Sequence, residues 1–473
     1  MLDELHEECG IFAIHNSADA AVNTALGLHA LQHRGQEAAG IVTMSGECFS
    51  AHFADGLVAD NFNSGEIAKK LEGTAAIGHV RYSTAGKKSA RNYQPIYAQL
   101  SFGFLAIAHN GNLTNAITLR NRLIQRGAIF QSTMDTEVII HLIALSQKPT
   151  LPEKIIDAVS QIEGAFSLVL IHKDGIFAIR DPNGVRPLSI ATLGDSVVVA
   201  SETCAFDIIG AKFMRDVEHG EMVIINKEGI KSMQPFEIKP SKFCIFEYVY
   251  FARPDSAIEG KSVYAMRKNI GIELAKEIHI DADVVVPIPD SGVPAAIGYA
   301  AQSKIPFELG IIRNHYVGRT FIEPTDKIRH FGVKLKHNAN LEVIKDKRVI
   351  LIDDSIVRGT TSKKIVQMIR DAGAKEVHML IASPPTIAPC FYGVDTPDKK
   401  DLVAANHTIE EIKKMIGVDH LAYISIDGLY RAIEGTKRDE ANPQYCDACF
   451  TDKYPIRLSD KEGGSIPLFD FMK

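Results

Sequence analysis

Residues 349–361 are Val349-Ile350-Leu351-Ile352-Asp353-Asp354-Ser355-Ile356-Val357-Arg358-Gly359-Thr360-Thr361. Four apolar residues predict a buried strand. Two carboxylates, Asp353 and Asp354, follow at its carboxyl end, where ligands bind in open α/β sheets. The next residues supply Gly359 and three hydroxyls just as a helix begins, and the backbone N–H groups of such a helix start favour an anion. This chemistry suits a sugar phosphate, with carboxylates for ribose hydroxyls and a hard cation, and a loop for the phosphate.

The surrounding sequence alternates between strands and helices. Past residue 260 we expect helices at 263–278, 294–302 and 360–372, and strands at 284–288, 348–352 and 377–382. Strands that alternate with helices of this length indicate βαβ units and a parallel sheet.

The 349–361 pattern resembles the signature of type I phosphoribosyltransferases, although adjacent acids could instead cap a helix. The resemblance implies a site for phosphoribosyl pyrophosphate (PRPP) made by Asp353, Asp354, Ser355, Arg358, Gly359, Thr360 and Thr361. A second loop, Pro287-Ile288-Pro289-Asp290-Ser291-Gly292, could be an ordinary turn. By resemblance it is the pyrophosphate loop, and Ser291, Asp353 and Asp354 would then hold one Mg²⁺ per subunit.

Residues 313–337 between these loops are rich in Arg, Lys and His. They could form a solvated loop. This region resembles the flexible catalytic loop that closes over PRPP in the phosphoribosyltransferase family. The candidates for contact with pyrophosphate are Arg319, Lys327, Arg329 and Lys334. Of these, Lys334 is expected to bind PRPP.

Residues 9–240 have a different pattern, with apolar runs broken by turn dipeptides such as Asn110–Gly111 and Asp174–Gly175. Helical spacing appears in 22–31, 117–125 and 138–145. This mixture predicts stacked antiparallel sheets with helices outside.

A cysteine such as Cys9, at the start of a strand, is usually buried and inert. Three further segments change that interpretation: Gln32-His33-Arg34-Gly35-Gln36-Glu37 at a helix end, His79-Val80-Arg81-Tyr82-Ser83-Thr84 after a short strand, and His109-Asn110-Gly111-Asn112-Leu113 as a tight turn. Together with Asp135 they resemble the glutaminase domain of class II (N-terminal nucleophile) amidotransferases.

The resemblance implies a mechanism. Removal of Met1–Glu8 as a propeptide would give Cys9 a free α-amine, which can act as the base for its thiol. Arg81 would bind the carboxylate of glutamine and Asp135 its ammonium group. Asn110 and the N–H of Gly111 would stabilise the oxyanion. Arg34 could brace the site or contact glutamine, and His79 and His109 are expected to pack or hydrogen-bond.

Four other cysteines, Cys244, Cys390, Cys446 and Cys449, form a separate group. The Cys446-x-x-Cys449 spacing suits a two-thiolate clip. A site of four thiolates could hold zinc or a [4Fe–4S] cluster. Together with a short acidic propeptide, these cysteines resemble one branch of the amidophosphoribosyltransferase family, and that resemblance implies one [4Fe–4S] cluster per subunit. Cys48 and Cys204 are expected to be ordinary thiols.

A class II glutaminase followed by a type I phosphoribosyltransferase resembles the amidophosphoribosyltransferase family. The resemblance implies an αββα N-terminal-nucleophile hydrolase sandwich at 9–240 and a parallel-sheet phosphoribosyltransferase domain at 241–473, which carries the cluster ligands. The implied reaction converts glutamine, PRPP and water to 5-phosphoribosylamine, glutamate and pyrophosphate, the first committed step of purine synthesis, with ammonia channelled between the sites. A homotetramer inhibited by purine nucleotides is also implied.

Composition agrees with this assignment. A net charge of −6 gives no reason to expect nucleic acid as a partner. No apolar run approaches the length of a membrane span, and no secretory signal is recognisable, so we expect a cytoplasmic protein. Two alternatives are a PRPP-sensing regulatory protein and a class II amidotransferase of another kind. A PRPP-sensing regulatory protein would have a basic DNA-binding module and no intact glutaminase. A class II amidotransferase of another kind would lack the motif at 352–361.

Overall fold

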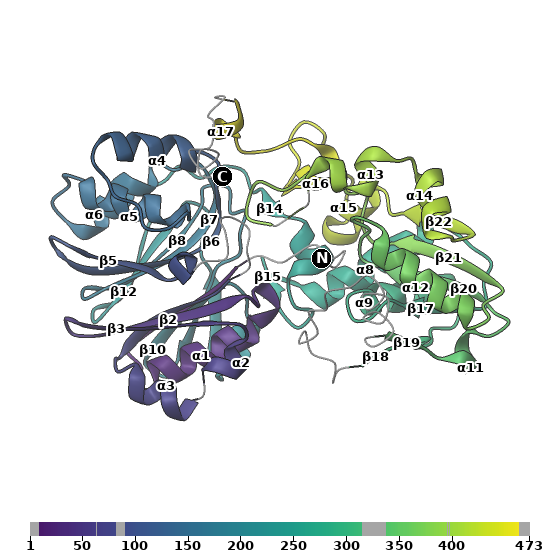
Figure 1. Cartoon of the computed structure of the whole chain (residues 1–473), viewed down its shortest axis with the longest axis horizontal. Coiled ribbons are helices and arrows are strands. Elements are labelled where there is room, and N and C mark those ends of the chain that lie inside the picture. Colours follow the sequence, from purple (N-terminus) through teal and green to yellow (C-terminus); the bar gives the residue numbers. More distant parts are fainter. Residues whose placement is uncertain are drawn as a thin grey trace.

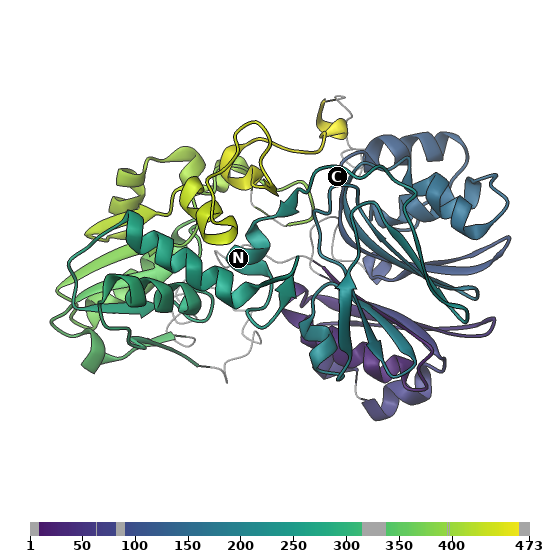
Figure 2. The ribbon, with the colours of Figure 1, turned by 180° about the vertical axis from the view of Figure 1, so that it is seen from behind.

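The computed structural model describes residues 9–62, 64–81, 90–314, 337–394, 396 and 398–462. The chain forms two lobes that lie side by side (Figure 1). The amino-terminal half makes one lobe and residues from about 260 onward make the other. The view from behind shows the last described segment crossing back over the first lobe (Figure 2).

The first lobe contains two antiparallel sheets. One sheet has the order β11(Lys212–Asp216)-β9(Ser189–Leu193)-β10(Ser196–Ala200)-β1(Gly10–His15)-β4(Ala75–Arg81)-β2(Ala38–Ser45)-β3(Cys48–Asp55). The other has the order β13(Gly229–Met233)-β12(Met222–Asn226)-β8(Gly175–Arg180)-β7(Gly164–His172)-β6(Gly103–Leu113)-β5(Ile96–Leu100).

The two sheets face each other across an apolar core that includes Ile11, Ile77 and Val169. Helices α1(Ala20–Ala30), α2(Val58–Asn61), α3(Ser64–Lys70) and α7(Cys204–Asp207) belong to the outer side of the first sheet, and α4(Ala116–Gln125), α5(Thr136–Leu145) and α6(Leu151–Val159) to that of the second. The predicted αββα sandwich is confirmed (Figure 1).

Two local predictions in this lobe were wrong. Asn110 and Gly111 do not form a turn, because β6 continues through them to Leu113 and pairs them with Ser167 and Phe166 of β7. Gly111 is here a strand residue with a φ of +142°, a conformation that residues with a side chain rarely adopt. His79–Arg81 likewise lie inside β4 and not after it.

The second lobe has the parallel sheet order β17(Val284–Pro287)-β20(Arg348–Asp353)-β21(Glu376–Ile381)-β22(His420–Tyr423). The helices around it are α8(Val263–Glu277), α9(Val293–Ser303), α11(Leu341–Ile344), α12(Thr360–Asp371), α13(Val403–Asn406), α14(Ile409–Ile416) and α15(Ile426–Glu434). Short strands β18(Ile311–Arg313) and β19(His337–Ala339) pair at its edge. The parallel sheet confirms the predicted phosphoribosyltransferase fold.

Helix α12 shows how its sequence specifies its position. Buried residues recur at Ser362, Ile365, Val366 and Ile369, which is the spacing of one helical face. This face packs into the same core as Leu351 of β20, and each fully buried aliphatic side chain contributes about 1.5–3 kcal/mol. A charged residue at Ile365 would therefore detach the helix from the sheet.

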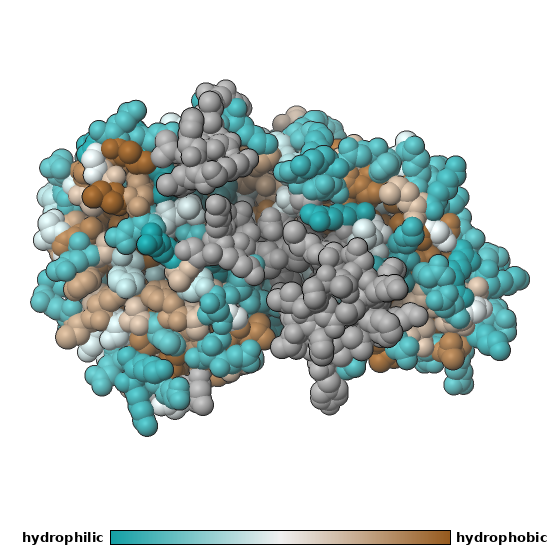
Figure 3. All heavy atoms as spheres, in the orientation of Figure 1, coloured by the Kyte–Doolittle hydropathy of each residue, from teal (hydrophilic) through white to brown (hydrophobic). Residues whose placement is uncertain are grey.

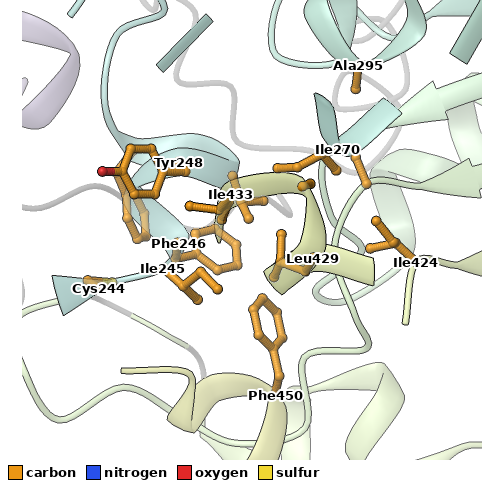
Figure 4. Packing of buried hydrophobic residues seen from close by; sticks show 14 of the residues in the cluster. Cys244, Ile245, Phe246, Tyr248, Ile270, Ala295, Ile424, Leu429, Ile433 and Phe450 are labelled. Atoms are coloured by element: carbon orange, nitrogen blue, oxygen red, sulfur yellow. The ribbon is translucent and has the colours of Figure 1, made fainter. Parts of the chain in front are cut away.

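The junction of the lobes has a core of its own. It combines residues 243–252, which include a π-helical turn at Glu247–Phe251, with α8, α15 and the segment 445–450. Figure 4 shows Phe246 and Phe450, whose ring centroids are 5.7 Å apart, packed near Leu429 and Ile433. Strand β14(Phe243–Cys244) pairs in parallel with β23(Tyr445–Cys446).

On the face in Figure 3, apolar residues occur in separate groups among polar ones. No helix in the described ranges is both long and apolar enough to cross a membrane.

Candidate active sites

The carboxylates Asp353 and Asp354 lie where the central strand β20 ends. Both are nearly buried, since β20 runs between β17 and β21. The backbone N–H of Asp354 donates to Oδ1 of Asp353 (3.0 Å), and the Ser355 hydroxyl donates to Oδ2 of Asp354 (2.8 Å). Burial raises the pKa of Asp354, while hydrogen bonds from Ser291 and Ser355 and the charge of Arg267 oppose this rise. Two adjacent buried acids are suited to hold a cation.

The loop after these acids ends at Gly359, which has φ +80° and precedes the first residue of α12. A left-handed residue at this point favours glycine. The first N–H groups of α12 therefore point out of the helix, where they can bind an anion.

The second predicted loop lies beside the first, because β17 and β20 are neighbouring parallel strands. Gly292 is required there, since a Cβ would lie 2.3 Å from the carbonyl oxygen of Ile352. One cavity is lined by Tyr250, Ile288, Pro289, Ser291, His337, Asp353, Asp354, Ser355, Ile356, Val357, Gly359, Thr361, Ser362 and Ile365.

Six predicted residues thus share one cavity: Ser291, Asp353, Asp354, Ser355, Gly359 and Thr361. Arg358 and Thr360 are not among its lining residues, and Thr360 is exposed. Lys334, with Arg319, Lys327 and Arg329, lies outside the described residues. Sequence reasoning missed Tyr250, Ser362 and Arg267.

In the other lobe Cys9 immediately precedes β1 and is buried. The register pairs Gly10 with Val80, so Cys9 and Arg81 lie at the same end of β1 and β4. The backbone carbonyl of Cys9 accepts a hydrogen bond from Nε of Arg34 (3.3 Å). Residues 1–8, and Tyr82, Ser83 and Thr84 after Arg81, lie outside the described ranges.

Strand β6 brings Asn110 to the nucleophile strand through Ser201. The Ser201 hydroxyl accepts from the N–H of Ile11 (3.0 Å) and from Nδ2 of Asn110 at the long distance of 3.5 Å. In the described part of the chain, the buried Oδ1 of Asn110 has no hydrogen-bond partner. Such a loosely held amide is available to a ligand.

Gly111 follows and leaves no room for a side chain. A Cβ would lie 2.0 Å from the carbonyl oxygen of Ala165. Glycine is therefore required here for the close approach of β6 to β7.

Asp135 precedes α5 and is tied to the same strand. Its Oδ2 accepts from the N–H of Leu113 (2.9 Å). Burial raises the pKa of Asp135, but the charge of His109 and hydrogen bonds from His109, Leu113 and Thr136 outweigh burial and lower it. The carboxylate is thus kept ionised, as the binding of an ammonium group requires.

The predicted packing role of His79 agrees with its surroundings. His79 is fully buried, and its Nε2 lies 3.2 Å from the carbonyl oxygen of His109. Burial first, and then the charge of Arg81, lowers the pKa of His79 to about 3. The imidazole is therefore neutral at physiological pH.

Arg34 braces the site from within a buried network. Its Nη1 donates to Glu202 (2.6 Å) and its Nη2 donates to Glu247 (2.8 Å), and all three side chains are almost completely buried. Glu202 also accepts from His33 and from the Ser256 hydroxyl. Sequence reasoning missed both glutamates, because nothing local in the sequence marks a carboxylate as the partner of a distant arginine.

The cysteines Cys244, Cys390, Cys446 and Cys449 line one cavity with aromatic residues from the junction core. Cys244 and Cys446 are directly paired by β14 and β23. Burial raises the pKa of the Cys446 thiol to about 12, and burial also raises those of Cys244 and Cys449. Thiols in such surroundings are unlike reactive cysteines.

These four cysteines border a common cavity. Within the described ranges, no group of three or more His, Cys, Asp or Glu is compact enough for a metal ion. A single zinc ion needs four sulfurs about 2.3 Å away. Four thiols around one cavity are a donor set that suits either zinc or an iron–sulfur cluster. Cys48 is exposed and Cys204 is buried.

Both halves of the chain match known protein families. The glutamine amidotransferase domain family matches residues 79–207, and the phosphoribosyl transferase domain family matches residues 261–383. The amidophosphoribosyltransferase of Rhizobium etli is 56% identical over 98% of this chain and 95% of its own length. That of Bacillus subtilis is 50% identical over 96% of this chain and 95% of its own length.

The chain belongs to the amidophosphoribosyltransferase family. Among solved structures, the Bacillus subtilis glutamine PRPP amidotransferase complexed with ADP and GMP is similar, with a TM-score of 0.90 and 48% identity, over 95% of this chain and 98% of that one. A structure described as the allosteric regulatory enzyme of purine biosynthesis has a TM-score of 0.91 and 49% identity, over 95% and 97%. The family confirms the predicted two-domain fold and the predicted type of enzyme.

Proposed function

We propose that this amidophosphoribosyltransferase converts glutamine, PRPP and water to 5-phosphoribosylamine, glutamate and pyrophosphate in the cytoplasm. The observation that carries the proposal is the cavity in which Ser291 hydrogen-bonds Asp354 beside Asp353 at the start of α12. A regulatory protein that only senses PRPP would have no use for the second site around Cys9.

In the glutaminase site, removal of residues 1–8 frees the α-amine of Cys9, which takes the proton of the thiol and later returns it to the departing amide nitrogen. The thiolate attacks the amide carbon of glutamine. The negative charge develops on the carbonyl oxygen, and Asn110 with the N–H of Gly111 stabilises it. Ammonia leaves, and water hydrolyses the glutamyl thioester to glutamate. Arg81 and Asp135 hold the carboxylate and the ammonium group of glutamine.

In the phosphoribosyl site, the loop before α12 binds the 5′-phosphate, while Asp353 and Asp354 hold ribose hydroxyls and stabilise positive charge on the ribose. Ser291, Asp353 and Asp354 would hold Mg²⁺, which supplies charge neutralisation for pyrophosphate as it leaves. Ammonia reaches the ribose carbon through the interior of the protein, since ammonia in solution would be lost and protonated.

Cys244, Cys390, Cys446 and Cys449 would hold a [4Fe–4S] cluster, which supplies a structural crosslink between the junction and the carboxyl-terminal segment. Their shared cavity supports this assignment. Purine nucleotides are proposed as inhibitors, because the Bacillus subtilis relative was solved with ADP and GMP. The homotetramer stays a prediction, for which light scattering is the test.

The test is glutamate release from glutamine by anaerobically purified protein, with and without PRPP and Mg²⁺, in parallel with the Cys9→Ala variant. We expect release that rises when PRPP is added. The variant should lose this activity and still form phosphoribosylamine from ammonia. If the variant releases glutamate normally, Cys9 is not the nucleophile. Intact mass shows whether residues 1–8 are present.

A further inference from the structure

Two segments of the second half lie on the glutaminase lobe beside its predicted oxyanion strand. One is the loop 390–393, and the other is the segment 454–461, which ends within α17(Ser459–Glu462). We call them together the clasp. Figures 1 and 2 both show α17 next to α4, far from the lobe to which its sequence neighbours belong.

The first contact of the clasp is between two glycines. Gly393 lies so close to Gly111 that a Cβ on Gly393 would be 2.8 Å from the Cα of Gly111. The backbone of the second half therefore packs directly against Gly111. Gly111 also packs closely against the backbone of Ala165, so two backbone segments from different parts of the chain contact this glycine.

Two consecutive carbonyl groups of the clasp extend this contact. The carbonyl oxygen of Phe391 accepts from Nδ2 of Asn112, and that of Tyr392 accepts from Nε of Arg186, each at 2.9 Å. Asn112 directly follows Gly111 in β6. The loop thus fixes both the position of β6 and its direction as it leaves the sheet.

The third contact caps α4, the helix that follows β6. Its own N-cap residue, Asn115, makes no capping hydrogen bond with its side chain. Asp460 of the clasp supplies it, since its carboxylate accepts from the N–H groups of Ile117 (2.8 Å) and Thr118 (3.0 Å). The N–H of Asp460 donates to Thr114 (3.0 Å). A carboxylate at a helix start also gains from the helix dipole.

The two parts of the clasp are bound to each other. The Tyr392 hydroxyl donates to the carbonyl of Ile456 (2.6 Å) and accepts from its N–H (3.0 Å). The Tyr454 hydroxyl donates to the carbonyl of Pro389 (2.7 Å), and the ammonium of Lys461 lies 3.6 Å from the ring centre of Phe391. The clasp therefore acts as one unit on residues 111–118.

We propose that Asp460 and the loop 390–393 are positioning elements for the glutaminase reaction, which set the backbone of Gly111 from the other half of the chain. The proposal rests on the oxyanion role of Asn110 and Gly111 proposed above. Oxyanion donors act only at the correct distance, and a displacement of about 1 Å can cost on the order of 100-fold in rate. The phosphoribosyl site, at the ends of β17 and β20, makes no use of this contact.

The test compares Asp460→Ala and Asn112→Ala with wild type in glutamine-dependent and ammonia-dependent synthesis. We expect kcat with glutamine to fall about tenfold, with little change in the KM for glutamine and in the rate with ammonia. Asp460→Asn should restore part of the rate, because its amide oxygen can still accept one N–H. The matched control is Glu410→Gln, an exposed acid of α14 in the second half, whose partner Lys413 lies on the same helix.

Three results overturn the inference: unchanged kcat with glutamine in both alanine variants, an equal fall of both activities, or an effect on KM alone. Asn110→Ala is measured in parallel. If Asn110→Ala keeps full activity with glutamine, the proposed oxyanion site itself is wrong. If it loses that activity and Asp460→Ala does not, only the role of the clasp is wrong.

Discussion

The Nε of Arg34 donates a hydrogen bond to the backbone carbonyl of Cys9, across 3.3 Å. The same guanidinium forms ion pairs with Glu202 and with Glu247, and Glu247 lies in the π-helical turn at the junction of the lobes. Burial alone would lower the pKa of Arg34, but both glutamates raise it, so the side chain stays charged. The backbone of the proposed nucleophile is therefore held by a residue whose charge is balanced from the junction.

Glu202→Gln should destabilise the protein in a pH-dependent way. Burial raises the pKa of Glu202, but His33, Arg34 and hydrogen bonds outweigh it, so its pKa lies well below the usual range. A carboxylate with a lowered folded-state pKa contributes stability above its unfolded pKa, about 4.3, and this stability is lost as the pH falls. We expect a loss of about 3 kcal/mol at pH 7.

Thermal unfolding of both proteins between pH 3.5 and 7 measures this effect. The difference in Tm between wild type and Glu202→Gln should be largest at pH 7 and shrink below about pH 4.3. Glu228→Gln, at an exposed position, serves as the control. A difference that is constant with pH would contradict the ion-pair account of Glu202.

Arg81→Lys should weaken the binding of glutamine. The guanidinium can form two parallel hydrogen bonds with a carboxylate, and an ammonium group cannot. We expect the KM for glutamine to rise roughly 10- to 100-fold, while synthesis from ammonia is unchanged. Arg122→Lys, on the exposed side of α4, should have normal kinetics. A normal KM in Arg81→Lys would exclude Arg81 as the carboxylate ligand.

Asp354→Asn should abolish synthesis from both nitrogen donors without loss of stability. Loss of a charge that stabilises the transition state costs on the order of 100- to 1,000-fold. Removing one of two adjacent buried acids relieves repulsion, so Tm should stay equal or rise. Asp283→Asn is the control, because Asp283 pairs with Arg348 at the opposite end of the strands. Retained activity in Asp354→Asn would argue against this cavity as the reaction site.

Cys446→Ser should remove a ligand of the proposed cluster. Wild-type protein purified without oxygen should contain about four iron atoms per chain, and the variant should lose iron and unfold at lower temperature. Cys48→Ser, at an exposed thiol, should keep both properties. Elemental analysis that finds zinc in place of iron would contradict the cluster.

Sequence alone predicted the elements that its periodicity encodes. Strand 348–352 and helix 360–372 were found within one residue, because an apolar run and a 3.6-residue pattern are local signals. The grouping of Ser291 with Asp353 and Asp354 came from the resemblance to phosphoribosyltransferases, and the three residues line one cavity. Asn110–Gly111 was misread, because the pairing of β6 with β7 overrides a local turn preference.

Contacts between distant segments could not be predicted. Nothing near Asp460 shows that it caps a helix that begins at residue 116, and nothing near Arg34 identifies Glu247 as its partner. Such pairs are set by the way in which the lobes meet, and a single sequence carries no local trace of that arrangement.

The cap that Asp460 provides also bears on synthesis of the protein. During translation, α4 and β6 leave the ribosome long before the codon for Asp460 is read, and the amino-terminal lobe can fold while the remainder is still being made. Until then α4 lacks its cap, and Gly111 lacks its contact with Gly393. A nascent chain would therefore hydrolyse glutamine poorly, and the cell would not lose its amide nitrogen to an enzyme that still has no acceptor site.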